Sequence, residues 1–141
     1  MTPNIPNAIP NGVKFVVDVR DIQQETIQQC VDEIKAVTEK YAKENDVKFT
    51  VEKTASSEAI KIQDYIKEVM VEQAEKLDLD YVLMPSGPVH DSNYMAEVTD
   101  VAMIFVPSVD GRSHVNEEYT DWDDIKAGVD LLLNTLVAIS Q

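Results

Sequence analysis

The 141-residue sequence has little of what several kinds of protein require. Cys30 is its only cysteine, so it can form neither an intrachain disulfide nor a cysteine zinc cage. No apolar run approaches the roughly 20 residues of a membrane-spanning helix. The first ten residues have neither the basic nor the apolar region of a secretory signal. These absences predict a soluble protein in a reducing, cytoplasmic setting.

Basic residues are also scarce. The chain has 12 Lys and Arg against 26 Asp and Glu, which gives a formal net charge of −14 at pH 7. A surface of this sign repels phosphate groups, so we expect neither nucleic acid nor an anionic membrane as a partner. The hydrophobic content of 44% beside 27% charged residues is nevertheless typical of a folded protein rather than of a disordered acidic tail.

The apolar pattern of the first part of the chain predicts a strand, a helix and a second strand. Apolar residues alternate over 13–20 and again over 47–53, as in half-buried strands. Between them, over 21–45, they recur at steps of three and four, as in an amphipathic helix. The small residues of 54–57 then favour a boundary between two structural pieces.

The pattern of the second part of the chain predicts several helices and one buried strand. Residues 101–106 are apolar without alternation, as in a parallel strand covered on both faces. The other elements that we expect are helices over 58–77, from about Asp91 through Val98 and from Thr120 onward, with loops over 85–91 and 107–119. The predicted fold class is therefore α/β, in two unequal parts.

Arg20 and Asn7 are candidate ligand-binding residues in the first part. Arg20 is one of only two arginines, and its planar fork suits bidentate binding of a carboxylate. The alternative is a surface ion pair. Asn7 could orient a ligand through its amide, although a turn-forming role is the default in a segment rich in Pro and Asn.

Both histidines lie in loops of the second part. His90 precedes a predicted helix whose backbone N–H groups could hold an anion; alternatively, Ser86 and Asp91 only start that helix. His114 follows the buried strand, at the end where α/β sheets place ligands, but a lone loop histidine is often only solvent-exposed. Glu117 and Glu118 could support it or favour the dipole of the next helix. Cys30 lies in an apolar stripe and is predicted to be a core residue.

Three segments of the second part resemble one enzyme family. They are Met84-Pro-Ser-Gly-Pro-Val-His-Asp91, Ala102-Met-Ile-Phe-Val-Pro-Ser108 and Gly111-Arg-Ser-His-Val-Asn-Glu-Glu118. They are similar to Ser-Gly-Ala-Gly-His-Asp-Ala, Met-Ile-Phe-Val-Pro-Ser and Gly-Ile-Ser-His-x-Pro-x-Glu of the dinuclear zinc amidohydrolases. This group includes N-carbamoyl-L-amino acid hydrolases, allantoate amidohydrolases and β-ureidopropionases.

The first part resembles the same family. Pro3-Asn-Ile-Pro-Asn-Ala-Ile-Pro10 and Phe15-Val-Val-Asp-Val-Arg20 are similar to its Pro-Asn-x-x-Asn-Val-Ile-Pro and Phe-x-x-Asp-Ile-Arg. The resemblance spans nearly the whole chain in one order. It implies that residues 1–55 are the second half of a dimerisation domain. Residues 56–141 would be the C-terminal segment of an α/β catalytic domain.

The resemblance also implies roles for individual residues. Arg20 would bind the carboxylate of a small substrate, and Asn7 would bind the same substrate. Ser86, Gly87 and His90 would line it, and His114 would bind a zinc or manganese ion. The family's other metal ligands and its glutamate base match nothing in this sequence, so the chain offers no catalytic residue of its own. We expect it to bind metal poorly and to have negligible activity alone.

The sequence departs from the family at two places and leaves three functions open. Pro88 and Val89 replace Ala-Gly, which removes a flexible glycine, and Asn116 replaces a proline. The main expectation is the C-terminal fragment of an amidohydrolase that cleaves linear C–N bonds of N-carbamoyl amino acids or allantoate. The alternatives are a non-enzymatic dimerisation or ligand-binding module, and one half of a split enzyme with a separate N-terminal chain. An unpaired sheet edge predicts a homo-oligomer.

Overall fold

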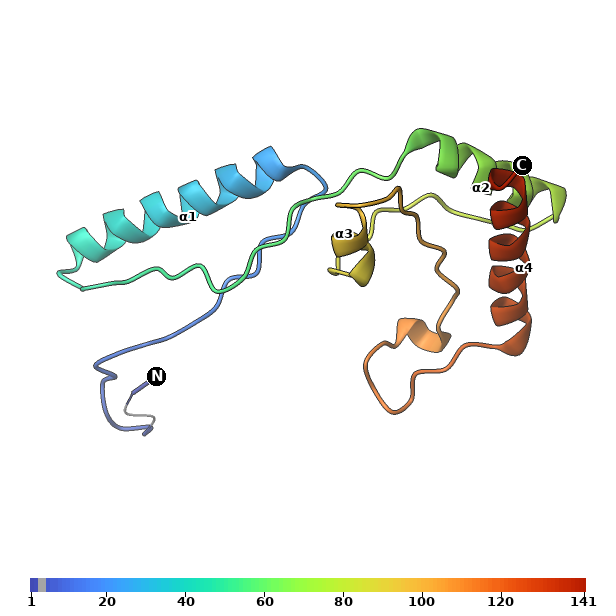
Figure 1. The fold of residues 1–141 in the computed structure, drawn as a ribbon. Coiled ribbons are helices and arrows are strands. Elements are labelled where there is room, and N and C mark those ends of the chain that lie inside the picture. The colour runs from blue at the N-terminus through green and yellow to red at the C-terminus, as the bar shows by residue number, and fades with distance from the viewer. Residues whose placement is uncertain (3–4) are drawn as a thin grey trace. The chain divides into compact units, whose positions relative to one another are not determined.

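The computed structural model describes residues 1–2 and 5–141, which divide into two units. The first unit is Met1–Thr54 and the second is Ala55–Gln141. Figure 1 shows a long helix between extended segments in the first, and several helices joined by irregular segments in the second. The division falls inside the junction 54–57. The assignment of the two units to a dimerisation and a catalytic domain stays a prediction.

The first unit is built on helix α1 (Gln24–Glu44), close to the helix predicted over 21–45. Glu25 in its first turn and Lys43 in its last turn complement the helix dipole. The helix ends because Asp46 adopts the left-handed conformation, with a φ of 52°. The turn that follows lets Val47 N–H donate to Ala42 C=O at 2.9 Å, a Schellman cap.

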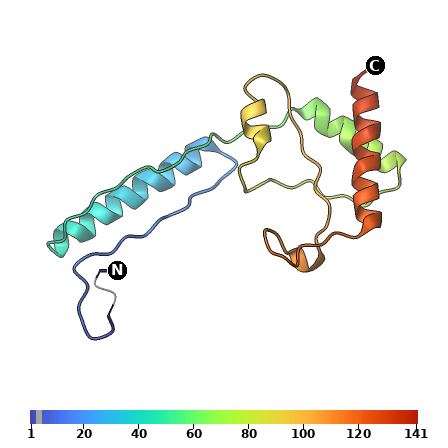
Figure 2. The ribbon, with the colours of Figure 1, turned by 60° about the horizontal axis from the view of Figure 1, so that its bottom comes forward.

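The predicted strands of the first unit are wrong. Both 13–20 and 47–53 are extended, as Figure 2 shows, but neither takes part in a sheet ladder among the described residues. Near them, the described residues form an isolated antiparallel bridge between Thr2 and Gly12. A strand exists only when a second strand accepts its backbone hydrogen bonds, and the described residues supply no such partner. Most of the alternating apolar side chains therefore stay exposed, with Phe15 73% accessible, and Val19 is half-buried.

The second unit has its core between helices α2 (Asp64–Lys76) and α4 (Trp122–Ile139), which pack on each other. Ile66 and Ala74 of α2 are buried, and so is Thr135 of α4. Two short helices, α3 (Asp91–Met95) and η1 (Val109–Gly111), lie in the long connection between them. The buried strand predicted over 101–106 is also wrong, because this segment is irregular and only its first four residues are half-buried.

Gly128 of α4 marks a close approach between α4 and the segment 104–106. A Cβ atom at this position would lie 2.6 Å from Val106 Cγ1 and 4.0 Å from Ile104 Cγ2. A methyl group at this position would therefore force the Val106 side chain to shift. Gly is a poor helix former, but at position 128 the packing of α4 favours it.

Replacing Gly128 with Ala should lower the free energy of unfolding by about 1 kcal/mol. Forcing a methyl group into this contact costs about 1–3 kcal/mol. The better helix propensity of Ala returns about 1 kcal/mol. Chemical denaturation measures the change, and the double variant Gly128→Ala, Val106→Ala is the control. The double variant should recover most of the loss; a Gly128→Ala variant more stable than the wild type would contradict the packing argument.

Candidate functional site

Arg20 already holds a carboxylate in the first unit. Its Nε donates to Asp18 Oδ1 at 2.9 Å and its Nη2 donates to Asp18 Oδ2 at 2.7 Å. This is the two-pronged geometry in which a guanidinium binds any carboxylate. Both side chains are more than half exposed, so the pair adds little to stability. The structure thus contains the surface ion pair that the sequence left open, in a geometry that would also suit a ligand.

The pair shifts the titration of Asp18. The hydrogen bonds from Arg20, helped by its charge, lower the pKa of the Asp18 carboxyl below its ordinary value. The carboxylate therefore stays ionised at neutral pH, and the pair is lost only as the pH falls through that lowered pKa. An incoming substrate carboxylate would compete with Asp18 for the same guanidinium at neutral pH.

Asn7 lies in a turn. Ala8 N–H donates to Ile5 C=O at 3.3 Å, so Pro6 and Asn7 are the two central residues of a tight turn. The Asn7 side chain is exposed. This is the turn-forming role that the sequence favoured. The substrate-binding role of Asn7 stays a prediction.

Ser86 and His90 are brought together in the second unit. Ser86 Oγ lies 2.8 Å from His90 Nε2, and both residues are half-buried. The His90 ring meets Phe105 edge-on, with ring centroids 5.8 Å apart. Gly87, between them in the loop, is exposed, and nothing lies within 4 Å of the position that a Cβ would take. The contact between Ser86 and His90 therefore joins the two ends of the loop, while Gly87 in its middle is exposed.

His114 is held by its backbone rather than by its ring. Its φ is 60°, an uncommon conformation for a residue with a side chain, and its N–H donates to Glu118 Oε2 at 2.7 Å. Two hydrogen bonds stabilise the loop around His114. Ser108 Oγ donates to Arg112 C=O at 2.6 Å, and Val109 N–H donates to Tyr119 C=O at 2.8 Å. His114 itself is exposed. The sequence placed Glu118 near this histidine but did not predict that it binds the main chain.

The described residues do not complete a metal site. Over 1–2 and 5–141, no group of three His, Cys, Asp or Glu side chains is placed to hold an ion. The carboxylate of Glu118, which the sequence offered as a support for His114, accepts from the His114 main-chain N–H. One imidazole without further donors does not fit a zinc ion, which takes four ligands or three and a water. His114 as a metal ligand stays a prediction that needs donors from elsewhere.

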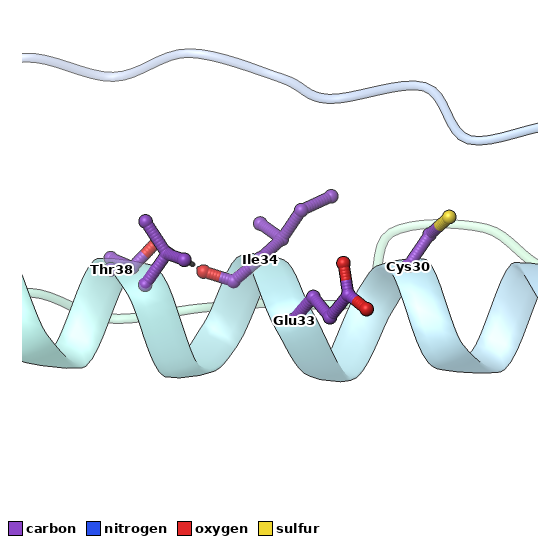
Figure 3. A pocket seen from close by; sticks show the side chains of 5 residues that line it. Cys30, Glu33, Ile34 and Thr38 are labelled. Carbon is purple, nitrogen blue, oxygen red and sulfur yellow. Dashed lines mark hydrogen bonds between the residues drawn. The ribbon is translucent and has the colours of Figure 1, made fainter.

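A hollow of about 340 Å³ lies on the surface of α1. It is lined by Cys30, Glu33, Ile34, Val37 and Thr38, all from the helix itself (Figure 3). Thr38 donates its hydroxyl to Ile34 C=O at 2.7 Å, so that hydroxyl is turned back to the helix. The hollow is thus a largely apolar face of the helix that also carries Glu33. Cys30 is half-buried in it rather than fully buried as a core residue would be.

The sequence profile of peptidase family M20/M25/M40 matches residues 4–138. The chain belongs to this family. The match covers nearly all of the sequence, including every candidate residue in both units. Members of this family generally use divalent metals. The resemblance found in the loop motifs is therefore confirmed at the level of the family.

Several curated relatives match the chain along its length. It is 32% identical over 141 residues to an N-carbamoyl-L-amino-acid amidohydrolase of Paenarthrobacter aurescens, covering 100% of this chain and 34% of the relative. It is 32% identical over 139 residues to a ureidoglycolate hydrolase of Arabidopsis thaliana, covering 98% and 29%. An allantoate amidohydrolase of Bacillus subtilis is 26% identical over 138 residues, covering 98% and 34%. The M20 chain thus spans about a third of the length of these relatives.

Membrane insertion has no support among the helices of the described residues. None of them is both long and apolar enough to cross a bilayer. The cytoplasmic location that the single cysteine favours stays a prediction.

Proposed function

We propose that this chain is a segment of an M20 amidohydrolase that cleaves linear C–N bonds of N-carbamoyl amino acids or of allantoate. The observation that carries the proposal is the match over all 141 residues to an N-carbamoyl-L-amino-acid amidohydrolase. The relatives named for allantoate and ureidoglycolate extend it to ureido compounds as a class. All of these names describe hydrolases.

Within this proposal the chain supplies binding groups rather than the reaction centre. Arg20 takes the substrate carboxylate in the two-pronged geometry that it now uses for Asp18. Asn7 contributes its amide to the same substrate, and the loop Ser86 to His90 lines it. His114 is one donor to the divalent metal of the family. Since the described residues do not complete a metal site, we assign no step of the reaction to a metal held by this chain alone.

A chimera tests the proposal. The chain replaces the matching third of the Paenarthrobacter aurescens relative, and hydrolysis of N-carbamoyl-L-amino acids is measured with zinc or manganese present. We expect a folded, active chimera, and negligible activity from the 141-residue chain alone. A chimera that is folded by circular dichroism but inactive would count against an enzymatic function. Turnover by the isolated chain that disappears in His114→Asn would overturn the claim that it needs other polypeptide.

A non-enzymatic dimerisation or ligand-binding module is the second candidate. It is favoured by the exposed apolar residues of the extended segments, among them Val13, Phe15 and Phe49. Backbone groups without a ladder partner readily pair with another chain.

The chain alone should therefore form a homo-oligomer in solution. Edge pairing of its extended segments would bury both their backbone groups and their apolar side chains. Size-exclusion chromatography with light scattering measures the mass over a range of concentrations. Phe15→Lys, which places a charge on the exposed face, should shift the equilibrium toward the monomer, whereas Lys14→Ala should not. A mass that stays that of one chain at all concentrations would refute self-association.

A split enzyme is a variant of the first proposal. In it, a separate N-terminal chain supplies the remaining two thirds of the length of the relatives. Co-expression with a neighbouring reading frame separates it from the module, because only a split enzyme gains stoichiometric metal and activity from its partner.

A further inference from the structure

Asn11 and Gly12 lie at the end of the loop that the isolated bridge closes. Asn11 is the only asparagine in the sequence that is followed by glycine. Thr2 C=O accepts from Asn11 N–H at 2.8 Å and from Gly12 N–H at 3.2 Å, and Gly12 C=O accepts from Thr2 N–H at 2.8 Å. All three residues are exposed. The bond from Gly12 N–H is the longest of the three, at the end of the usual range, and it shares its acceptor.

Asparagine is one of the chemically labile residues of proteins, because the next backbone nitrogen can attack its side-chain amide. Here the nitrogen of Gly12 would lose its proton and form a bond to Asn11 Cγ, while the bond from Cγ to Nδ2 breaks and ammonia leaves. Water then opens the five-membered imide at one of its two carbonyl groups. Attack at Cγ gives aspartate, and attack at the main-chain carbonyl gives isoaspartate. The balance is amide and water to acid and ammonia, without oxidant or reductant.

The structure leaves this attack open. Apart from the neighbours of Gly12 in the chain, no heavy atom of the described residues lies within 4 Å of the position that a Cβ would take there. Glycine also has no side chain that would hinder the approach of its nitrogen to the neighbouring amide. Because Asn11 and Gly12 are both exposed, water reaches the imide that would form between them.

Asp110 and Gly111 form a second pair of this kind, but in a more restrained state. Asp110 is the only aspartate followed by glycine. The attacking nitrogen would be that of Gly111, whose N–H donates to Ser108 C=O at 2.9 Å, an ordinary length. The carboxylate that it would attack pairs with Arg112 Nη2 at 3.2 Å. A carboxylate is also a poorer target for a nucleophile than an amide. The structure therefore separates an open pair at 11–12 from a restrained pair at 110–111.

We propose that Asn11 is a site of spontaneous modification, at which the nitrogen of Gly12 displaces ammonia and a mixture of isoaspartate and aspartate forms. The product adds one negative charge to a chain whose formal net charge is −14. As isoaspartate it also adds one carbon to the backbone between the two residues, which changes the spacing of the bonds that both make to Thr2. The site does not depend on the proposed function.

Ageing of the purified 141-residue chain in mildly alkaline buffer tests the proposal. Peptide mass spectrometry measures conversion at each asparagine, and electron-transfer fragmentation separates isoaspartate from aspartate. Asn7 is an internal control, because its neighbour Ala8 donates a similar bond to Ile5 C=O, at 3.3 Å, but carries a side chain. We expect isoaspartate to form at Asn11 about tenfold faster than at Asn7, a difference of about 1.4 kcal/mol in the barrier.

Two variants test whether Gly12 is responsible. Gly12→Ala meets no atom of the described residues, so the chain should fold, and conversion at Asn11 should slow by about tenfold. Val13→Ala is the matched control. It shortens the exposed side chain of the next residue and should leave the rate at Asn11 unchanged.

Unfolding in denaturant tests whether the folded chain leaves the site open. The rate at Asn11 should change by about twofold or less, the effect of one weak hydrogen bond, whereas the rate at Asp110 should rise by about fivefold. The proposal fails if Asn11 converts no faster than Asn7 or yields aspartate without isoaspartate. It also fails if Gly12→Ala converts at the wild-type rate, or if unfolding accelerates Asn11 by more than about tenfold.

Discussion

Replacing Arg20 with Ala in the chimera should raise KM for an N-carbamoyl amino acid by about a hundredfold. Removing one partner of a hydrogen-bonded charge pair costs about 2–5 kcal/mol when the other is left unpaired, and 2.7 kcal/mol corresponds to about a hundredfold. The two bonds that Arg20 makes to Asp18 have the two-pronged geometry in which a guanidinium binds a carboxylate. Initial rates over a range of substrate concentrations measure the change.

Two controls test whether geometry or charge is responsible. Arg20→Lys keeps the charge but loses the fork, and should recover only part of the affinity. Lys14→Ala removes one positive charge from the same exposed segment and should change KM little. Equal effects of Arg20→Ala and Lys14→Ala would mean that Arg20 acts only through the general charge of the segment.

Replacing His114 with Asn in the chimera should lower kcat by about a thousandfold and reduce the bound metal. Loss of a metal's contribution to a reaction is worth several kcal/mol, and each 1.4 kcal/mol is tenfold in rate. Asn is preferred to Ala because the φ of 60° at this position is tolerated better by Asn. The loop should therefore keep its shape while the imidazole is lost. Activity assays and elemental analysis measure both effects.

Asn116→Ala is the matched control for His114. It lies in the same exposed loop and should leave both metal content and kcat nearly unchanged. If His114→Asn kept full metal and full activity in a folded chimera, His114 would not be a ligand. The account of the second unit would then lose its link to the metal.

The helices could be predicted from the sequence because their signal is local. The apolar period over 21–45 predicted α1 to within a few residues at each end. The helix predicted over 58–77 was too long at its start, because the backbone is still extended at Gln63, with a ψ of 135°. Helix boundaries depend on capping. Neither α1 nor α2 has a side-chain hydrogen bond at its N-cap residue that would mark where the helix begins.

The strands could not be settled in the same way. Alternation over 13–20 and 47–53 shows which side chains would share a face, but a strand also needs a partner at ladder distance. The described residues hold no such partner. The apolar segment 101–106 failed for the same reason. A pattern in one segment therefore predicts the faces of a sheet without establishing that a sheet forms.

Candidate site residues were found by motif, but their contacts were not. The loop motif singled out Ser86 and His90, yet their hydrogen bond depends on how Gly87 and Pro88 turn the chain. Likewise, the carboxylate of Glu118 accepts from the N–H of His114, a residue whose backbone is left-handed, and the residue types alone do not announce this contact. Such contacts depend on loop conformation, which the residue types alone leave open.

The metal content of the isolated, purified chain is the most direct test of the central claim, which is that its candidate residues complete a site only with polypeptide beyond these 141 residues. Elemental analysis after equilibration with zinc or manganese and removal of loosely bound ions should find far less than one metal ion per chain. Two tightly held ions per chain, lost together in His114→Asn, would contradict the account.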